Sequence, residues 1–190
     1  IRRDLHQHPE LSFQEVRTAG IAAREMEVLG FSVRTGIGRT GVIAELHNGE
    51  GPVIALRADM DALPIQEANT HDFVSQNPGV MHACGHDGHV AGLIGAARIL
   101  AEKRDSGLPP SGPIRFIFQP SEEATDDEGK SGAMRMVDEG VMEGVDAVVG
   151  LHLGGPLPCG KIFFAAGPIM SGAEELRIEV HGKSTHAGMP

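Results

Sequence analysis

The segment 81–89, MHACGHDGH, places three imidazoles, one thiol and one carboxylate within nine residues. Only one residue separates Cys84 from His86, so in an extended or tightly turned backbone both side chains can face the same ion. A thiolate and an imidazole are good ligands for borderline divalent metals such as zinc, nickel or manganese. The intervening Gly85 permits backbone angles that would strain other residues. The segment therefore predicts a metal site with Cys84 and His86 as ligands.

The apolar segment 90–100 follows directly and is typical of a buried helix. Cys84 and His86 would lie at the N-terminus of that helix, where the helix dipole favours the thiolate form of the cysteine. The alternative is that both are ordinary core or surface residues, because a C-x-H pattern alone is not specific. The metal hypothesis therefore requires further acidic or imidazole ligands from elsewhere in the chain.

Two pairs of acidic residues supply such candidates. Each pair follows an apolar segment that is typical of a central strand, 52–57 for the first pair and 114–118 for the second. Open α/β sheets bind ligands at the carboxyl ends of their strands. The alternatives are a solvated turn for the first pair and an acidic helix start for the second. The pairs are Asp59 with Asp61 and Glu122 with Glu123.

A third apolar segment, 145–153, carries His152 near its end. Taken alone, this histidine is either a satisfied core residue or a ligand. A strand–helix–strand unit joins parallel strands by a right-handed crossover, so the carboxyl ends of these strands meet at one edge of the sheet. That edge would carry four candidate ligands for one or two divalent ions, and two aspartates suited to fixing an imidazole tautomer. The ligands are Cys84, His86, Glu123 and His152, and the aspartates are Asp59 and Asp61.

The adjacent glutamates suggest a division of labour, in which one side chain binds metal and its neighbour stays free. A free carboxylate can take a proton from a metal-bound water, whose pKa the metal lowers toward ~7. This is the chemistry of amide or ester hydrolysis. The sequence has no P-loop, no GxGxxG pattern opening a helix and no G-x-S-x-G elbow, so neither nucleotide chemistry nor a serine nucleophile is indicated.

The elements that must position these residues alternate between helices and strands. Ser12 and Glu15 fit a capping box, which predicts a helix over 13–29 that ends at Gly30. Asn48-Gly49 is a hairpin signal between two strands. The pattern predicts an α/β fold, with a mostly parallel central sheet flanked by helices. The remaining expected elements are helices over 90–103 and 132–139 and strands over 31–34, 41–46 and 160–164.

Length and composition exclude several classes of protein. The chain has 190 residues, of which 41% are hydrophobic and 22% charged, as is ordinary for one globular domain or slightly more. Its formal net charge of −10 argues against nucleic acid as a partner. No apolar run reaches membrane-spanning length. One of the 2 cysteines lies in the candidate site, which argues against a structural disulfide and favours the reducing cytoplasm.

The hydrophobic pattern changes at Gly172. Residues 175–181 alternate between polar and apolar, as a half-exposed strand does, so a new sheet is expected to begin there. We therefore expect a metal-binding catalytic domain over 1–171 and the start of a smaller α+β satellite or dimerisation domain over 172–190. Because the chain starts at Ile1 without Met and stops just after a strand-like segment, we expect it to be a piece of a longer protein.

Several motifs, taken in order, resemble the M20 family of metallo-aminoacylases and carboxypeptidases. They are DLHQHPELSFQE, ALRADMDALPIQE, MHACGHDGHVAGLIGAA, FQPSEE, GLHL and GKSTHAGMP, and they extend over essentially the whole chain. The likeness is greatest to the N-acyl-amino-acid amidohydrolases, a branch that includes hippurate hydrolases and plant auxin-conjugate hydrolases. The resemblance implies a zinc-peptidase-like catalytic domain. It also implies hydrolysis of the amide bond of N-acyl amino acids or related small peptides.

The resemblance implies roles for individual residues as well. Cys84 resembles a ligand that bridges two divalent ions, for which zinc, manganese, nickel and cobalt are all acceptable. Glu122 resembles the general base. His186, in the H-A-x-P motif, resembles the histidine that family members supply across a homodimer interface to stabilise the oxyanion. The remaining ligands implied by the resemblance are His86, Glu123 and His152.

Two departures from the family pattern affect these expectations. Segment 124–131 is longer and more acidic than the glycine-rich segment usual in the family, so the rim of the site is expected to differ. The family's last metal-binding histidine lies further downstream than this sequence extends. The alternative hypothesis is therefore a truncated, non-catalytic metal-binding or dimerising fragment that lacks the last metal ligand.

Overall fold

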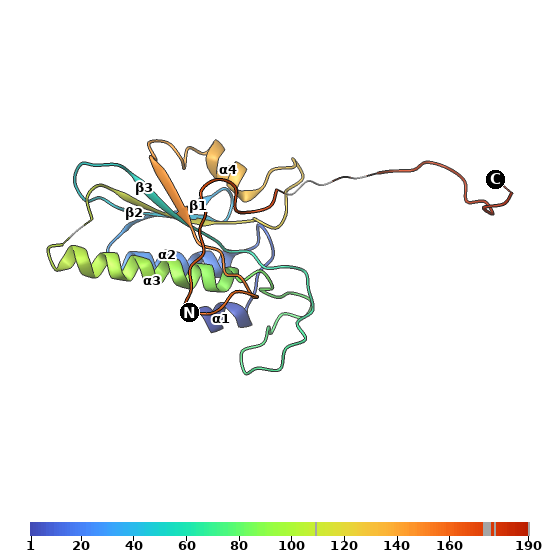
Figure 1. Ribbon diagram of the computed structural model, residues 1–190, viewed down its shortest axis with the longest axis horizontal. Helices are drawn as coiled ribbons and strands as arrows, with labels where there is room; N and C mark the ends of the chain where they lie inside the picture. The colour runs from blue at the N-terminus through green and yellow to red at the C-terminus, as the bar shows by residue number, and fades with distance from the viewer. Residues whose placement is uncertain (109, 173–175, 177, 190) are drawn as a thin grey trace. The chain divides into compact units, whose positions relative to one another are not determined.

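Contacts within the chain divide it into two units, residues 1–154 and residues 155–190. The first unit is a five-stranded sheet with helices on both faces (Figure 1). The domain boundary that we expect at residue 172 stays a prediction. The computed structural model describes residues 1–108, 110–172, 176 and 178–189.

Five strands form the sheet: β1 (Ser32–Ile37), β2 (Gly41–Leu46), β3 (Ile54–Asp59), β4 (Ile114–Gln119) and β5 (Ala147–Gly150). Their order across the sheet is β1-β2-β4-β3-β5. The pairs β1–β2 and β2–β4 are antiparallel, whereas β3 is parallel to both β4 and β5. The α/β class is confirmed, with a sheet of mixed type. The parallel arrangement expected for the three strands that lead into the candidate site is also confirmed.

Four helices accompany the sheet: α1 (Arg2–Gln7), α2 (Val16–Val28), α3 (His86–Asp105) and α4 (Gly132–Asp138). α2 and α3 lie along one face of the sheet and α4 lies on the other (Figure 1). α3 forms the expected crossover between β3 and β4. Gly30 follows α2 with a left-handed φ of +79°, which confirms it as the glycine that ends this helix. In the described ranges of the chain, no helix is both long and apolar enough to cross a membrane.

The strands bury both of their faces, because successive side chains of a strand point to opposite sides of the sheet. Ala44 and Phe116 belong to the larger core cluster together with residues of α2 and α3. Ile43 and Ile117 belong to the smaller cluster together with Met136 of α4. The strands are therefore apolar along their length, and their polar residues gather where they end.

The hairpin expected at Asn48-Gly49 is wrong. β2 and β3 flank this dipeptide in the sequence, but β4 lies between them in the sheet. β4 pairs in parallel with β3, from Ile54 with Ile114 onward, and it also pairs antiparallel with β2, from Leu46 with Ile114 onward. The crossover through α3 returns the chain beside β3, so long-range pairing overrides the local turn signal.

The capping box expected at the start of α2 is also wrong. The Ser12 hydroxyl donates instead to Asp61 Oδ2, at 2.6 Å. Glu15 is the residue before the first helical residue, and its fully buried carboxylate accepts hydrogen bonds from the main-chain N–H groups of Phe13 and Ser121, at 2.9 and 2.8 Å. Both side chains are therefore used for contacts with distant segments rather than for capping the helix.

The strand expected over 160–164 is wrong, since these residues form no strand in the structure. Ile162 and Phe164 are 77% and 90% exposed, so this apolar segment packs against little within the described part of the second unit. A strand requires a hydrogen-bonded neighbour, and no described residue supplies one here. The strand expected over 175–181 includes residues 175 and 177, which lie outside the described residues.

The long loop between β3 and α3 is anchored by the buried carboxylate of Glu67. Its oxygens contact the Ser75 main-chain N–H at 2.6 Å, the Asn69 side-chain amide at 2.9 Å and the His6 ring at 3.1 Å. Burial raises the pKa of Glu67, but these contacts outweigh the effect of burial and lower the pKa to about 2. An ionised carboxylate therefore holds the loop at neutral pH.

This anchor makes stability sensitive to acid. A carboxyl group whose pKa is lowered by folding stabilises the protein above its unfolded-state pKa of 4.5, and the contribution is lost as the pH falls toward about 2. We expect Glu67→Gln to lower the free energy of unfolding by about 2 kcal/mol at pH 7 and by little near pH 2. Urea unfolding across this range measures the difference, with the exposed Glu50→Gln as control. An effect of Glu67→Gln that does not change with pH would contradict this prediction.

Candidate metal centre

The segments that carry the candidate residues meet at the carboxyl ends of the parallel strands. Asp59 is the last residue of β3, His86 is the first residue of α3, and His152 lies two residues beyond the end of β5. Glu122 and Glu123 follow β4 by three and four residues. The structure therefore brings residues from four separate segments of the chain to one edge of the sheet, within the unit 1–154.

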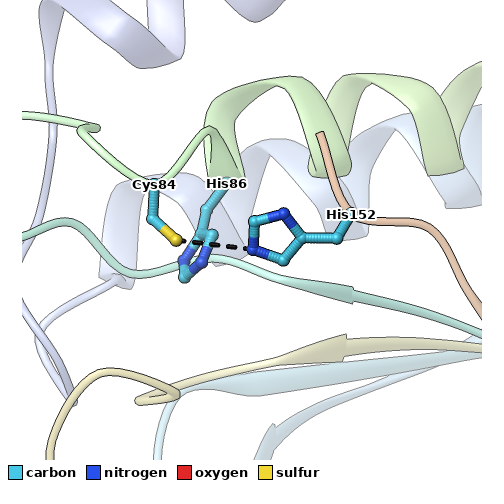
Figure 2. A group of neighbouring side chains, drawn as sticks. All are labelled: Cys84, His86 and His152. Carbon is cyan, nitrogen blue, oxygen red and sulfur yellow. Dashed lines mark hydrogen bonds between the residues drawn. The ribbon is translucent and has the colours of Figure 1, made fainter. Parts of the chain in front are cut away.

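Cys84, His86 and His152 form the first group of potential ligands (Figure 2). Cys84 Sγ lies 3.4 Å from His152 Nε2, and one ligand atom from each of the three residues lies within 4.8 Å of the others. Gly85 permits this approach, because its φ of +87° lies in the left-handed region that other residues adopt only at a cost. The tight turn between Cys84 and His86 is confirmed, and both side chains reach the same point.

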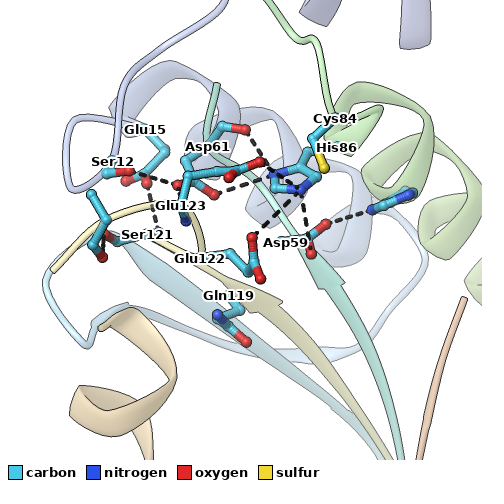
Figure 3. Close-up of polar contacts among 12 residues, drawn as sticks. Ser12, Glu15, Asp59, Asp61, Cys84, His86, Gln119, Ser121, Glu122 and Glu123 are labelled. Carbon is cyan, nitrogen blue, oxygen red and sulfur yellow. Dashed lines mark hydrogen bonds and ion pairs between the residues drawn. The ribbon is translucent and has the colours of Figure 1, made fainter. Parts of the chain in front are cut away.

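His86 also belongs to a second group, with Glu122 and Glu123 (Figure 3). His86 Nε2 lies 3.7 Å from Glu123 Oε1 and 4.0 Å from Glu122 Oε2. It lies 3.6 Å from Asp59 Oδ2. These separations are too long for hydrogen bonds. The two glutamates of this group and Asp59 therefore point three carboxylates at one buried imidazole nitrogen without bonding to it.

The two groups fit a divalent cation. Among the residues that the structure describes, His86 Nε2 and Glu123 Oε1 are buried side-chain atoms without a hydrogen-bond partner. Such atoms are rare in folded proteins and call for an explanation. A sulfur, imidazole nitrogens and carboxylate oxygens are donors that zinc and related ions accept. A cation at this point would satisfy both atoms and offset the clustered negative charge.

The tautomer of His86 is fixed from the other side of its ring. His86 Nδ1 lies 2.8 Å from the main-chain carbonyl oxygen of Asp61. A carbonyl oxygen only accepts, so in the neutral ring Nδ1 carries the proton and Nε2 keeps its lone pair for a ligand role. The tautomer-fixing role expected of Asp61 is thus performed by its main-chain carbonyl, with Oδ1 of the same residue 3.3 Å from the ring nitrogen.

Asp59 binds a different histidine. Its Oδ1 lies 2.5 Å from His89 Nδ1, and its Oδ2 accepts a hydrogen bond from Arg57 Nη1 at 2.6 Å. Burial raises the pKa of Asp59, but the His89 hydrogen bond and the nearby His86 and Arg57 outweigh it, and the pKa falls to about 2. We did not predict a role for His89 from the sequence. Its position three residues after His86 in a helix, hence on the same face, was the available signal.

The loop that presents Glu123 is held by a buried polar network (Figure 3). Asp61 Oδ2 accepts hydrogen bonds from the Ser12 hydroxyl at 2.6 Å and from the main-chain N–H of Glu123 at 3.0 Å. Glu15 accepts the main-chain N–H of Ser121, a residue with a left-handed φ of +42°. The segment before α2 therefore braces the loop after β4, a contact that the sequence did not reveal.

Glu15→Ala is expected to destabilise the protein strongly. The change leaves the N–H groups of Phe13 and Ser121 and the Thr40 hydroxyl without their acceptor. Each unsatisfied buried group costs about 1–3 kcal/mol, so we expect the free energy of unfolding to fall by about 3 kcal/mol. Glu27→Ala, at an exposed position of α2, should change the free energy of unfolding by less than about 0.5 kcal/mol. Equal effects in urea unfolding would contradict the bracing role.

The carboxylates of the site raise the pKa values of neighbouring groups in the absence of a cation. Burial raises the pKa of the Cys84 thiol to about 12, and Glu123, Glu122 and Asp59 add to this effect. The thiolate form expected from the helix dipole is therefore wrong for the metal-free protein, because burial and three carboxylates outweigh the dipole. Burial likewise raises the pKa of Glu122, and the charges of Glu123 and Asp59 raise it further. A bound cation would lower the pKa of the Cys84 thiol and favour the thiolate.

His186 belongs to the unit 155–190, whereas the residues above belong to the unit 1–154. Its Nδ1 accepts a hydrogen bond from the main-chain N–H of Gly188 at 3.2 Å. Since a main-chain N–H only donates, the neutral ring carries its proton on Nε2. The expected role of His186 at an oxyanion stays a prediction.

The chain is similar to known hydrolases along its whole length. The family model described as peptidase family M20/M25/M40 matches residues 55–189. The N-acyl-L-amino acid amidohydrolase of Geobacillus stearothermophilus is 49% identical over 190 residues, which are 100% of this chain and 50% of that protein. The IAA-amino acid hydrolase ILR1-like 2 of Arabidopsis thaliana is 44% identical over 190 residues, 100% of this chain and 42% of that protein. The chain thus spans about half the length of these curated relatives.

A solved structure supports the same assignment. The YXEP protein of Bacillus subtilis, described as a dinuclear metal binding peptidase from the M20 family, is 48% identical with a TM-score of 0.74. The match covers 83% of this chain and 42% of that one. Fold, sequence and the family model agree, and the family model covers well over half of the chain. The chain therefore belongs to peptidase family M20/M25/M40.

Proposed function

We propose that this chain is the metal-binding part of an amidohydrolase that cleaves the amide bond of N-acyl amino acids or related small peptides. The observation that carries the proposal is the pair of buried, unpartnered atoms, His86 Nε2 and Glu123 Oε1, 3.7 Å apart and beside the Cys84–His152 contact. The Geobacillus relative, named as an N-acyl-L-amino acid amidohydrolase, supports the substrate class.

We assign two divalent ions to the two groups of potential ligands, and the one free lone pair of His86, on Nε2, serves one of the ions. The YXEP structure, described as dinuclear, supports this number. Sulfur, imidazole and carboxylate donors together accept zinc, manganese, nickel or cobalt. Cys84 is the donor suited to bridge the ions, as the family resemblance implies. The residues proposed to hold the ions are Cys84, His86, Glu123 and His152.

When bound, such ions lower the pKa of water toward ~7 and polarise a carbonyl group. Glu122 then takes a proton from the attacking water and passes it to the leaving amine. A C–O bond forms, the C–N bond breaks, and the products are a carboxylate and a free amino acid. The geometry supports this role, because the Glu122 carboxylate reaches the site while its side chain is 43% exposed and open to substrate.

We further propose that the chain acts in a cytoplasmic homodimer, in which His186 of one copy serves the active site of the other. Within the described part of the chain no residue accepts from the Nε2–H of His186, which can donate to the oxyanion of the tetrahedral intermediate. The two cysteines, Cys84 and Cys159, are both free, as expected in a reducing compartment.

The second candidate is a non-catalytic metal-binding or dimerising fragment. It is favoured by the match to only 50% of the Geobacillus relative. Elemental analysis of the dialysed protein, together with an assay for amino acid released from N-acetyl and N-benzoyl amino acids, separates the two. Two metal equivalents with hydrolysis support the amidohydrolase, and metal without hydrolysis supports a metal-binding fragment. A metal-free protein contradicts the amidohydrolase and leaves only a dimerising fragment.

A further inference from the structure

His89 lies in the first turn of α3 with its side chain only 2% exposed, and both of its ring nitrogens are engaged. Nε2 accepts a hydrogen bond from the main-chain N–H of Leu153 at 2.8 Å. Because a main-chain N–H only donates, the proton of the neutral ring is on Nδ1, which donates to Asp59 Oδ1 at 2.5 Å. His89 therefore has no lone pair left for a metal ion, although its nitrogens lie close to Asp59 and His86.

The hydrogen bond from Leu153 to His89 also restrains His152, the residue before Leu153 and a proposed metal ligand. His152 lies beyond the end of β5, where hydrogen bonds between strands no longer hold the chain, and it is exposed. The rings of His89 and His152 also meet edge to face, with centroids 4.7 Å apart. His89 thus contacts both the ring of His152 and the peptide group that follows it.

A second contact fixes the same segment. The Leu153 side chain lies against Gly85 and Gly88 at the start of α3. A Cβ atom added to Gly88 would meet Leu153 Cδ1, so a larger residue at this position would displace the leucine side chain. The start of α3 therefore contacts both the main-chain N–H and the side chain of Leu153.

We infer that Asp59 and His89 form a positioning device that places His152 opposite Cys84 by holding the Leu153 peptide. Asp59 fixes the tautomer and orientation of His89, and Arg57 in turn holds Asp59 through a 2.6 Å hydrogen bond. The device joins the end of β3 to the segment after β5 through the first turn of α3. Its consequence for metal binding rests on the proposed function, whereas the hydrogen bond itself does not.

The first test needs no metal. Hydrogen exchange of the Leu153 amide, measured by NMR on the metal-free protein, should be at least about tenfold faster in His89→Ala than in the wild type. His89→Gln, which offers an acceptor to Leu153 and a donor to Asp59, should restore part of the protection. His82→Asn, a change at another buried histidine whose nitrogens bond to no described residue, should leave this amide protected. Unchanged exchange in His89→Ala overturns the inference.

The second test asks whether His89 acts through His152. Loss of a group that orients a ligand lowers metal affinity by about 10–100-fold, so His89→Ala should do so in zinc competition with a chelator. In a protein that already carries His152→Ala, the same change should have no further effect, because the ligand it positions is gone. Additive losses mean that His89 supports the site in another way and overturn the inference. A wild type that binds no zinc refutes the proposed function, while the Leu153 amide still decides the inference.

Discussion

Cys84→Ala is expected to remove bound divalent metal and hydrolysis together. The Cys84 sulfur lies 3.4 Å from His152 Nε2 and belongs to one group of potential ligands with His86 and His152. Its loss therefore leaves that group with two imidazoles and no sulfur ligand. Removal of a group that merely orients a ligand costs about 10–100-fold in affinity, and removal of the ligand itself should cost more. Chelator competition with zinc measures the affinity, and release of free amino acid from N-acyl substrates measures the activity.

Cys159→Ala is the matched control, because this exposed cysteine belongs to the unit 155–190. It should keep both metal and activity. The free energy of unfolding of the metal-free Cys84→Ala protein should stay close to that of the wild type, which separates ligand loss from misfolding. Stoichiometric metal in Cys84→Ala would show that the sulfur is no ligand.

Glu122→Gln is expected to keep the metal but to abolish most of the hydrolysis. The amide cannot take a proton from water, and loss of a general base costs about 10²–10⁴-fold in kcat. Metal affinity should change little, because Glu122 Oε2 stands 4.0 Å from His86 Nε2 and its side chain is the more exposed of the two glutamates, at 43% against 21%. The expected signature is a protein with its full metal content and a slow reaction.

Glu123→Gln provides the contrast, since it should lose metal and hydrolysis together. The exposed Glu128→Gln should change neither. Full hydrolysis by Glu122→Gln would remove the proposed base. Loss of metal from Glu122→Gln would instead make this residue a ligand and leave the base unassigned.

Much of the site follows from local patterns. The apolar segments that become β3 and β4 are each followed by paired carboxylates, and the helix between them requires a crossover of fixed hand. These features place Asp59, Glu123 and His152 at one edge before any coordinates are known. The C-x-H pattern with its glycine predicts the turn at Gly85 for the same reason, because backbone freedom at glycine is a local property.

Other parts of the site depend on contacts between segments far apart in the sequence. Ser12 and Glu15 satisfy a local capping rule, yet they bond to Asp61 and to Ser121, 49 and 106 residues away. The Asn48-Gly49 signal fails likewise, because β4 is inserted between the strands on either side. A prediction from a local sequence pattern fails where a buried partner elsewhere in the chain offers a stronger contact.

The sequence by itself determined the fold class, the family and the set of side chains that meet at the edge of the sheet. The fold class and the candidate ligands follow from strand periodicity, crossover handedness and ligand chemistry, which are properties of residue types and spacing. The family follows from the resemblance of the motifs. Only the tertiary structure decided which imidazole is free to bind and which is occupied. His86 and His89 share one face of α3, but Asp61 leaves Nε2 of the first unbonded, whereas Asp59 and Leu153 engage both nitrogens of the second. That difference arises from hydrogen-bond partners 25 to 64 residues away, which no local spacing encodes.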